Sequence, residues 1–217
     1  MSNFSDRLYD DVDSWETTMF LYNSALKEVG TKLEILNDEF QHIHRYNAIE
    51  HIKSRIKTSE SIVKKLRRHG YESTIENMVK YVNDIAGIRV ICSFTSDIYR
   101  IAEMIRLQND IHVIAVKDYI RLPKASGYKS YHMLVTVPVF LSDRTVDVKV
   151  EIQIRTVAMD FWASLEHKIN YKFEGNAPEH VKRELIECAG MVSALDNRMQ
   201  ELNEEIKALS KEDADGA

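Results

Sequence analysis

Residues 145–155 alternate between aliphatic and polar side chains, the pattern of a strand that is buried on one face only. The aliphatic members are Val146, Val148, Val150, Ile152 and Ile154, and the polar members are Asp147, Lys149, Glu151, Gln153 and Arg155. Such a polar face is most often simply solvated. Here the polar face contains positively and negatively charged side chains together with one amide. The strand also leads directly into an apolar, aromatic helix. We therefore also consider a face on which Glu151 could hold a cation and a polar ligand.

Positive charge is concentrated between residues 53 and 68, in a chain whose formal net charge is −5. Against the single acid Glu60, the cations of this stretch are Lys53, Arg55, Lys57, Lys64, Lys65, Arg67 and Arg68. A local excess of cations predicts an anion-binding patch, although a run of charge is more often a solvated helix. Ser61 and Lys65 are four residues apart and would share one helical face.

The loop of residues 121–129 forms a third candidate together with the strand that follows it. Gly127 permits a tight turn ahead of Tyr128. The cations near this aromatic residue in the sequence are Lys117, Lys124 and Lys129. An aromatic ring beside several cations suits a base with its phosphates. Tyr128 and His132 would lie on one side of a strand that begins by residue 128.

A fourth candidate runs from Asn83 to Arg89. It places the carboxylate of Asp84 just before a predicted strand and the guanidinium of Arg89 just inside it. An isolated Asp–Arg pair is more often a structural salt bridge. Only together with the other three stretches does this pair indicate a site.

Two long stretches outside these candidates repeat apolar residues at alternating steps of four and three, which predicts helices with a narrow apolar stripe. The first stripe is Trp15, Met19, Tyr22, Leu26, Val29, Leu33, Leu36, Phe40 and Ile43; the second is Val181, Leu185, Cys188, Val192, Leu195, Met199, Leu202, Ile206 and Leu209. Each stripe either packs on its own subunit or forms an oligomer interface, and the pattern favours neither.

Strands and shorter helices are expected between these two helices. The predicted helices cover 49–69, 74–85, 96–108 and 157–171, with Gly70 ending the first and Ser96 or Asp97 capping the third. The predicted strands cover 88–94, 111–120, 131–140 and 145–155. This order predicts an α+β fold with a mostly antiparallel sheet flanked by helices. We expect a single domain over 1–217, with an N-terminal helix at 15–45, a core at 49–172 and a C-terminal helix at 178–210.

The composition excludes several classes of site. The seven glycines are too far apart for a G-x-G-x-x-G or P-loop motif, so any nucleotide phosphate must be held by side chains. Two cysteines and scattered histidines give no zinc spacing. The start of the chain lacks the apolar segment of a signal peptide, and no run of about 18 apolar residues occurs. We therefore expect a cytoplasmic protein with no membrane partner.

Taken in order, the four candidate stretches resemble the synthetase domain of the RelA/SpoT family, and the chain length is similar to that of its stand-alone small alarmone synthetases of the RelQ type. The matching motifs, over roughly residues 50–172, are Arg55-Ile-Lys57 with Ser61 and Lys65, Asp84-Ile-Ala-Gly-Ile-Arg89, Asp118-Tyr-Ile with Pro123-Lys124 and Gly127-Tyr128-x-Ser130-x-His132, and Glu151-Ile-Gln-Ile-Arg-Thr156. One departure is Ser126, which stands where many long family members carry Asn.

The resemblance implies a nucleotidyltransferase-like fold and a GTP pyrophosphokinase activity. Such enzymes transfer the β,γ-pyrophosphoryl group of ATP to the 3′-hydroxyl of GDP or GTP, giving ppGpp or pppGpp and AMP. The hydrolase half of the long members has no counterpart in this sequence, so degradation of the product is not expected. Some RelQ-type proteins are homotetramers, which implies the same assembly here.

The resemblance also implies a role for each motif residue. Asp84 and Glu151 would hold Mg²⁺, and Glu151 would take the proton of the 3′-hydroxyl. The ATP-binding residues would be Arg55 and Arg89 on the adenine and Lys57, Ser61 and Lys65 on the phosphates. The acceptor-binding residues would be Tyr128, stacked on guanine, with Lys117, Lys124 and His132 around ribose and phosphates and Gln153 as support.

Three other interpretations stay open. An RNA-binding module could use the basic stretch and Tyr128, and single-stranded RNA is a possible partner, although the acidic net charge and the two carboxylates argue against this as the main role. A different nucleotidyltransferase would release pyrophosphate in place of AMP. A helical assembly protein would use its heptad helices to form stable oligomers. Nucleotides would not change the melting temperature of such a protein.

Overall fold

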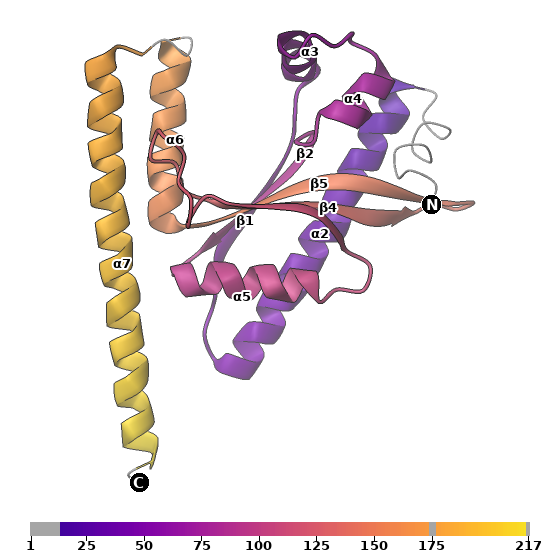
Figure 1. Cartoon of the computed structure of the whole chain (residues 1–217). Coiled ribbons are helices and arrows are strands. Elements are labelled where there is room, and N and C mark those ends of the chain that lie inside the picture. Colours follow the sequence, from indigo (N-terminus) through magenta and orange to yellow (C-terminus); the bar gives the residue numbers. More distant parts are fainter. Residues whose placement is uncertain (1–13, 174–176, 216–217) are drawn as a thin grey trace.

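The computed structural model describes residues 14–173 and 177–215 (Figure 1). In chain order its elements are α2 (Trp15–His44), β1 (Ile49–Ile56), α3 (Ser59–Arg68), α4 (Ile75–Tyr81), β2 (Ala86–Cys92), α5 (Thr95–Arg106), β3 (His112–Asp118), β4 (Tyr131–Phe140), β5 (Thr145–Thr156), α6 (Val157–Lys172) and α7 (Glu179–Asp215). Within these ranges no helix is both long enough and apolar enough to cross a bilayer.

The strands form one five-stranded sheet in the order β1-β2-β5-β4-β3. Among the described strands β2 and β5 pair in parallel, and every other neighbouring pair is antiparallel. The predicted α+β class with a mixed, mostly antiparallel sheet is therefore confirmed. The parallel register aligns Gly87 with Glu151 and Arg89 with Gln153, which brings the polar face of β5 beside the start of β2.

The core lies between the aliphatic face of the sheet and the helices α2 and α5. The even-numbered aliphatic residues of β5, from Val146 to Ile154, are at most 3% exposed. The middle of the first heptad stripe, from Tyr22 to Phe40, is buried as well. The N-terminal stripe therefore packs on the sheet of its own subunit, and the opposite, polar face of the sheet is left for a site.

The helix that we expected over 49–69 is wrong in its first part, because residues 49–56 form the edge strand β1. Ile49, Ile52 and Ile56 follow a helical three–four spacing, and this misled the prediction. A register shift between Ile49 and His51 inserts an extra residue, so that these isoleucines can all contribute to the core although their spacing is not even. The sheet consequently has one more strand than predicted.

Two helix boundaries also differ from the expectation. The helix predicted over 74–85 ends at Tyr81, so Asp84 lies in a connection and not on a helix. The helix predicted to be capped by Ser96 or Asp97 begins at Thr95, and its N-cap residue Phe94 makes no side-chain cap. Asp97 instead accepts a hydrogen bond of 2.6 Å from the hydroxyl of Tyr46.

The C-terminal helix α7 runs beside α6 and continues well past its end (Figure 1). Its second half carries exposed apolar side chains, namely Leu195, Met199, Leu202, Ile206 and Leu209. Unlike the N-terminal stripe, this part of the second heptad stripe stays largely exposed in the described part of the subunit.

Candidate active site

A cavity of about 680 Å³ opens on the polar face of the sheet. Its walls come from β1, β2, β4 and β5, from the connection before β2, from the loop before β4 and from α6. The residues that line it are Arg55, Asp84, Arg89, Lys124, Ser126, Tyr128, His132, Glu151, Gln153, Arg155, Ala163, Ser164, Glu166, His167 and Lys168. Cations, carboxylates and an aromatic ring thus face one space, as a site for a charged, aromatic ligand requires.

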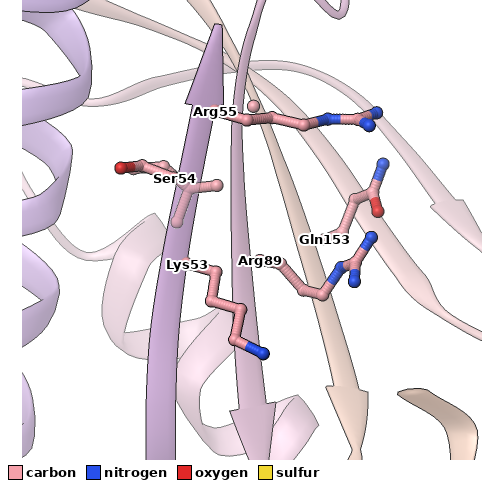
Figure 2. Close-up of a pocket in the computed structure, with 7 residues that line it drawn as sticks. Lys53, Ser54, Arg55, Arg89 and Gln153 are labelled. Atoms are coloured by element: carbon pink, nitrogen blue, oxygen red, sulfur yellow. The ribbon is translucent and has the colours of Figure 1, made fainter. Parts of the chain in front are cut away.

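A second cavity of about 240 Å³ adjoins the first on the side of β1. Its walls include Lys53, Ser54, Gly87 and Ile88, and it shares Arg55, Arg89 and Gln153 with the larger cavity. Figure 2 shows the side chains of Arg55, Gln153 and Arg89 extending to the same side of their three neighbouring strands. Two flat guanidinium groups on adjacent strands form a pocket in which a base can be stacked.

Asp84 lies in the connection between α4 and β2, where two lysines bind its carboxylate. Nζ of Lys57 is 2.9 Å from Oδ2, and Nζ of Lys65 is 2.8 Å from Oδ1. Burial raises the pKa of Asp84, but the hydrogen bonds from Lys65 and Lys57 outweigh this, and the net pKa lies below its ordinary value. Asp84 is therefore ionised, and both ammonium groups are already gathered where an anionic chain could reach them.

Glu151 lies in the middle of β5, half-buried between two polar side chains. Its Oε2 accepts a hydrogen bond of 2.8 Å from Nε2 of Gln153, and its Oε1 is 3.5 Å from Nδ1 of His132. Burial and the charge of Asp84 raise the pKa of Glu151, whereas His132 and Gln153 lower it, with a net pKa below the ordinary value. The opposing effect of Asp84 means that the two carboxylates lie within electrostatic range of each other.

Hydrogen bonds link Arg155, Tyr128 and His132. The guanidinium of Arg155 can only donate, so the Tyr128 hydroxyl accepts from it. The hydroxyl oxygen is also 2.9 Å from Nε2 of His132, and Nδ1 of the same ring is 3.5 Å from Oε1 of Glu151. The Tyr128 loop and Glu151 are in this way connected through His132.

The two-carboxylate geometry has a consequence for metal binding. In the ranges 14–173 and 177–215, no three His, Cys, Asp or Glu side chains gather into a metal site of their own. Asp84 and Glu151 nevertheless line the same cavity. One or two carboxylates completed by phosphate oxygens and water are the usual ligands of Mg²⁺, so the donor set suits this ion once a nucleotide is present.

Comparison with known proteins places this arrangement in a family. The model described as the region found in RelA/SpoT proteins matches residues 54–176, more than half of the chain. The chain belongs to the RelA/SpoT family.

Close relatives cover the chain almost from end to end. It is 45% identical to GTP pyrophosphokinase YwaC of Bacillus subtilis, over 93% of this chain and 96% of the relative. It is 38% identical to GTP pyrophosphokinase YjbM of the same organism, over 91% of this chain and 92% of the relative. Both alignments extend beyond the RelA/SpoT region into the long terminal helices.

Solved structures agree with these sequence matches. The structure of small alarmone synthetase 1 from Bacillus subtilis bound to its product pppGpp matches with a TM-score of 0.83 and 37% identity, and the match covers 89% of this chain and 98% of that one. The same synthetase bound to AMPCPP matches with a TM-score of 0.77 and 35% identity, with the same coverage of both chains.

Most residues that the RelA/SpoT motifs single out lie together in the structure. The predicted residues that line the larger cavity are Arg55, Asp84, Arg89, Lys124, Tyr128, His132, Glu151 and Gln153. Lys57 and Lys65 adjoin it through their ion pairs with Asp84.

Besides Lys57 and Lys65, two further predicted site residues do not line either cavity. Ser61 lies in the first turn of α3, where its hydroxyl accepts a hydrogen bond from that of Thr58. Lys117 is exposed on β3, paired in the sheet with His132. Their contact with a nucleotide remains a prediction.

Arg155 is the residue in the RelA/SpoT motifs that we did not assign to the site and that the structure places at its centre. It is 4% exposed and donates to Tyr128, Gln153, Ser130 and Asp160. Oδ1 of Asp160 also forms an ion pair with the guanidinium of Arg89, at 3.0 Å from Nη1. The sequence did contain a signal for this role of Arg155. The residue is a cation on the polar face at the end of a predicted strand, and the acid Asp160 follows five residues later in the next helix.

The wall formed by α6 was also missed. Glu166, His167 and Lys168 belong to the predicted helix, but nothing in their spacing indicates that they face the Tyr128 loop across the cavity. Lys124 lies over two aromatic rings, 4.6 Å from the Tyr128 centroid and 4.8 Å from that of Tyr119. Tyr119 therefore belongs to the aromatic cluster beside the site, although only its neighbours were singled out.

Proposed function

We propose that this chain is a GTP pyrophosphokinase, which transfers the β,γ-pyrophosphoryl group of ATP to the 3′-hydroxyl of GDP or GTP and releases AMP. The observation that carries this assignment is the pair of adjoining cavities that share Arg55, Arg89 and Gln153. One cavity suits a donor nucleotide and the other an acceptor, and the two ionised carboxylates face the larger of them. The relatives named GTP pyrophosphokinase support the same reaction.

The donor binds on the β1 side. Arg55 and Arg89 stack on the two faces of the adenine, because their strands pair and their guanidinium groups extend to the same side. Lys57 and Lys65 exchange their contact with Asp84 for the phosphate oxygens of ATP. The structure of a neighbour with AMPCPP bound supports a donor site in this fold.

Asp84 and Glu151 would hold Mg²⁺. Both carboxylates are ionised, reach the same cavity and interact electrostatically, which suits a hard divalent cation shared with phosphate oxygens. When bound, the ion supplies the positive charge that neutralises the phosphate chain during transfer.

The acceptor binds on the side of the Tyr128 loop. The guanine stacks on Tyr128, whose hydroxyl is fixed by Arg155 and His132. Lys124 lies over the Tyr128 ring and is placed to reach the ribose phosphates, and His132 and Gln153 hold the ribose next to Glu151.

Glu151 accepts the proton of the 3′-hydroxyl. The 3′-oxygen then forms a bond with the β-phosphorus of ATP, the bond from that phosphorus to the oxygen bridging it to the α-phosphate breaks, and AMP leaves. Alignment and charge neutralisation carry most of such a phosphoryl transfer. His132 and Gln153 keep the carboxylate oriented during this step.

An incubation with γ-labelled ATP, Mg²⁺ and either GDP or GTP tests this assignment. We expect the label to appear on the guanine nucleotide and AMP to accumulate, both separated by chromatography. A nucleotidyltransferase of another type would release labelled pyrophosphate and leave the guanine nucleotide unlabelled. That outcome, or labelling that persists in Glu151→Gln, contradicts the proposal.

The whole chain, residues 1–217, acts as one synthetase domain in this proposal, and it assembles as a homotetramer in the cytoplasm. The continuous core from α2 through β5 supports the first statement. The uncovered apolar side chains of α7, from Leu195 to Leu209, support association through this helix.

Single-stranded RNA is a second ligand that one surface favours. Tyr71 and Tyr81 stack face to face with their centroids 3.8 Å apart, both partly exposed, at the end of the basic helix α3. Stacking aromatics beside cations suit an unpaired strand. A salt-sensitive affinity for an RNA oligomer that is lost in Tyr81→Ala and kept in Glu151→Gln would support this; unchanged binding in Tyr81→Ala would contradict it.

A further inference from the structure

We propose that the C-terminal helix α7 positions the acceptor loop, so that residues on its inner face set the affinity for the guanine nucleotide without touching it. This inference rests on the proposed function, because it takes the Tyr128 loop as the acceptor site. The residues concerned are positioning residues, and four separate contacts tie α7 to the loop and to the elements beside it.

The closest approach is between Gly127 and Ala189. Gly127 has a φ of +86°, and a Cβ placed on it would lie 2.4 Å from Cβ of Ala189. Real carbon atoms do not approach to this distance, so only glycine fits between the loop and the helix. The backbone just before Tyr128 therefore rests directly on α7.

Polar contacts continue on the other side of Tyr128. The ammonium group of Lys129 donates to the hydroxyl of Ser193 on α7. One turn further along the helix, Oδ2 of Asp196 accepts a hydrogen bond of 2.8 Å from the hydroxyl of Thr156. Thr156 also accepts from the backbone N–H of Met159 over 3.1 Å, so this residue joins the end of β5, the start of α6 and α7.

The burial of Asp196 is informative because most of α7 is exposed. Its side chain is 7% exposed, and burial raises its pKa while Thr156 and Lys129 oppose the rise. A carboxyl group is rarely buried unless hydrogen bonds or a nearby charge offset the free-energy cost of its desolvation. Here it holds the end of the strand that carries Glu151 and faces the lysine next to Tyr128.

The packing leaves almost no free volume behind the loop. A void of only about 10 Å³ remains between Gly127, Lys129, Trp162 and α7, which is hardly enough for one water molecule. The indole N–H of Trp162 donates to the carbonyl of Leu185 over 3.0 Å and fixes α6 against α7. The loop cannot retreat from the cavity unless α7 moves as well.

A double-mutant cycle tests the Gly127–Ala189 contact. Gly127→Ala introduces both a clash with Ala189 and strain at positive φ, and we expect it to raise the KM for GDP on the order of tenfold. Ala189→Gly removes the clashing methyl group but not the φ strain. In the double variant, the KM for GDP should be lower than in Gly127→Ala by about threefold or more. The KM for ATP should stay within about twofold of wild type in all variants.

The matched control is Ala194→Gly, which places a glycine in the exposed face of the same helix. It should resemble Ala189→Gly in melting temperature and leave both KM values unchanged. A double variant that is no better than Gly127→Ala, or a parallel change in the KM for ATP, overturns the inference.

A second variant, Ser193→Ala, probes the hydrogen bond from Lys129. We expect a KM for GDP raised about fivefold, with kcat and the KM for ATP unchanged, and weaker binding of GDP by calorimetry in the absence of ATP. An unchanged GDP affinity in this variant overturns the inference, whereas failure of the wild-type protein to make ppGpp overturns the proposed function instead. Calorimetry keeps the two outcomes apart, because it needs no turnover.

Discussion

Four side chains connect the two halves of the site at the scale of single residues. Arg155, Tyr128 and His132 are linked by hydrogen bonds, and Nδ1 of His132 is 3.5 Å from Oε1 of Glu151, the proposed base. The guanidinium of Arg155 can only donate, so it fixes the position of the Tyr128 hydroxyl as an acceptor. The groups proposed to bind the acceptor therefore also contact Glu151, and we expect the loss of one to disturb the other.

Glu151→Gln should reduce pyrophosphate transfer on the order of 10³-fold, because an amide can neither accept the proton nor hold Mg²⁺ well. The melting temperature should stay within a few degrees of that of wild type, since the amide can keep the contact with Gln153. Release of AMP measured by chromatography gives the rate. Asp147→Asn, on the same face of β5, is the control and should stay near wild-type activity; near wild-type turnover of Glu151→Gln would refute the assignment of the base.

The charge of Asp84 should make the folded state sensitive to acid. Its folded pKa lies below the ordinary value of 3.8, so the unfolded chain binds the proton more readily. The stabilisation by Lys57 and Lys65 is complete above the unfolded pKa and is lost as the pH falls through the lower, folded one. Urea unfolding between pH 6 and pH 3 should show a decline of stability below about pH 4 that is shallower in Asp84→Asn. Identical pH profiles for the two proteins would contradict this.

Lys149 joins two elements that carry the carboxylates. It lies on β5, two residues before Glu151, and its Nζ donates to the carbonyls of Val79 and Lys80 at the end of α4 and to Oδ1 of Asn83, at 3.0 to 3.3 Å. Burial lowers the pKa of this ammonium group, as expected for a cation satisfied by carbonyls alone. The lysine thus clamps the connection that bears Asp84 to the strand that bears Glu151.

Lys149→Met should lower the free energy of unfolding by about 1 kcal/mol, because it removes the donor from the partly buried carbonyl of Val79 and from two exposed carbonyls. It should also raise the Mg²⁺ concentration needed for half-maximal activity, since the two carboxylates are no longer held together. Urea titration and a Mg²⁺ titration of the rate measure the two effects. Lys182→Met, on the exposed surface of α7, is the control; an unchanged Mg²⁺ requirement in Lys149→Met would show that the clamp is structural only.

The sequence predicted correctly those elements whose residue pattern is compatible with only one type of secondary structure. The strict alternation of 145–155 predicted β5 and its polar face, and the heptads predicted both long helices. The prediction was wrong for β1 because a bulge in this strand gives its isoleucines the spacing of a helix. Only the pairing with β2 distinguishes such a strand from a helix. Arg155 was missed because its importance depends on partners from several elements: Gln153 on β5 itself, Asp160 on α6, and Tyr128 and Ser130 from the loop before β4.

The chain has two heptad helices with opposite surroundings at the scale of the whole molecule. The stripe of α2 is buried in the core, whereas that of α7 ends in exposed apolar side chains, and the inner face of α7 contacts the Tyr128 loop. One helix therefore faces the site on one side and solvent or another subunit on the other. Assembly through α7 would act on the same helix that positions the loop.

Ile206→Glu should shift the protein to a smaller species in size-exclusion chromatography with light scattering, because it puts a charge in the uncovered apolar stripe, where Ile206 is 62% exposed. The fold should be unaffected, since most of the Ile206 side chain is exposed. Leu107→Glu, at the exposed C-cap of α5, is the control and should leave the mass unchanged. A mass that does not change in Ile206→Glu would argue against association through α7.

The parallel pairing of β2 with β5 has one more consequence, which concerns how the enzyme can fail. Arg89 and Gln153 share a cavity because the ladder sets Gly87 opposite Glu151. Displacing β5 along its neighbours by a single position would exchange its two faces, sending a carboxylate inward and an isoleucine outward. A molecule in which β5 has slipped by one position should therefore be inactive, because Glu151 no longer faces the cavity.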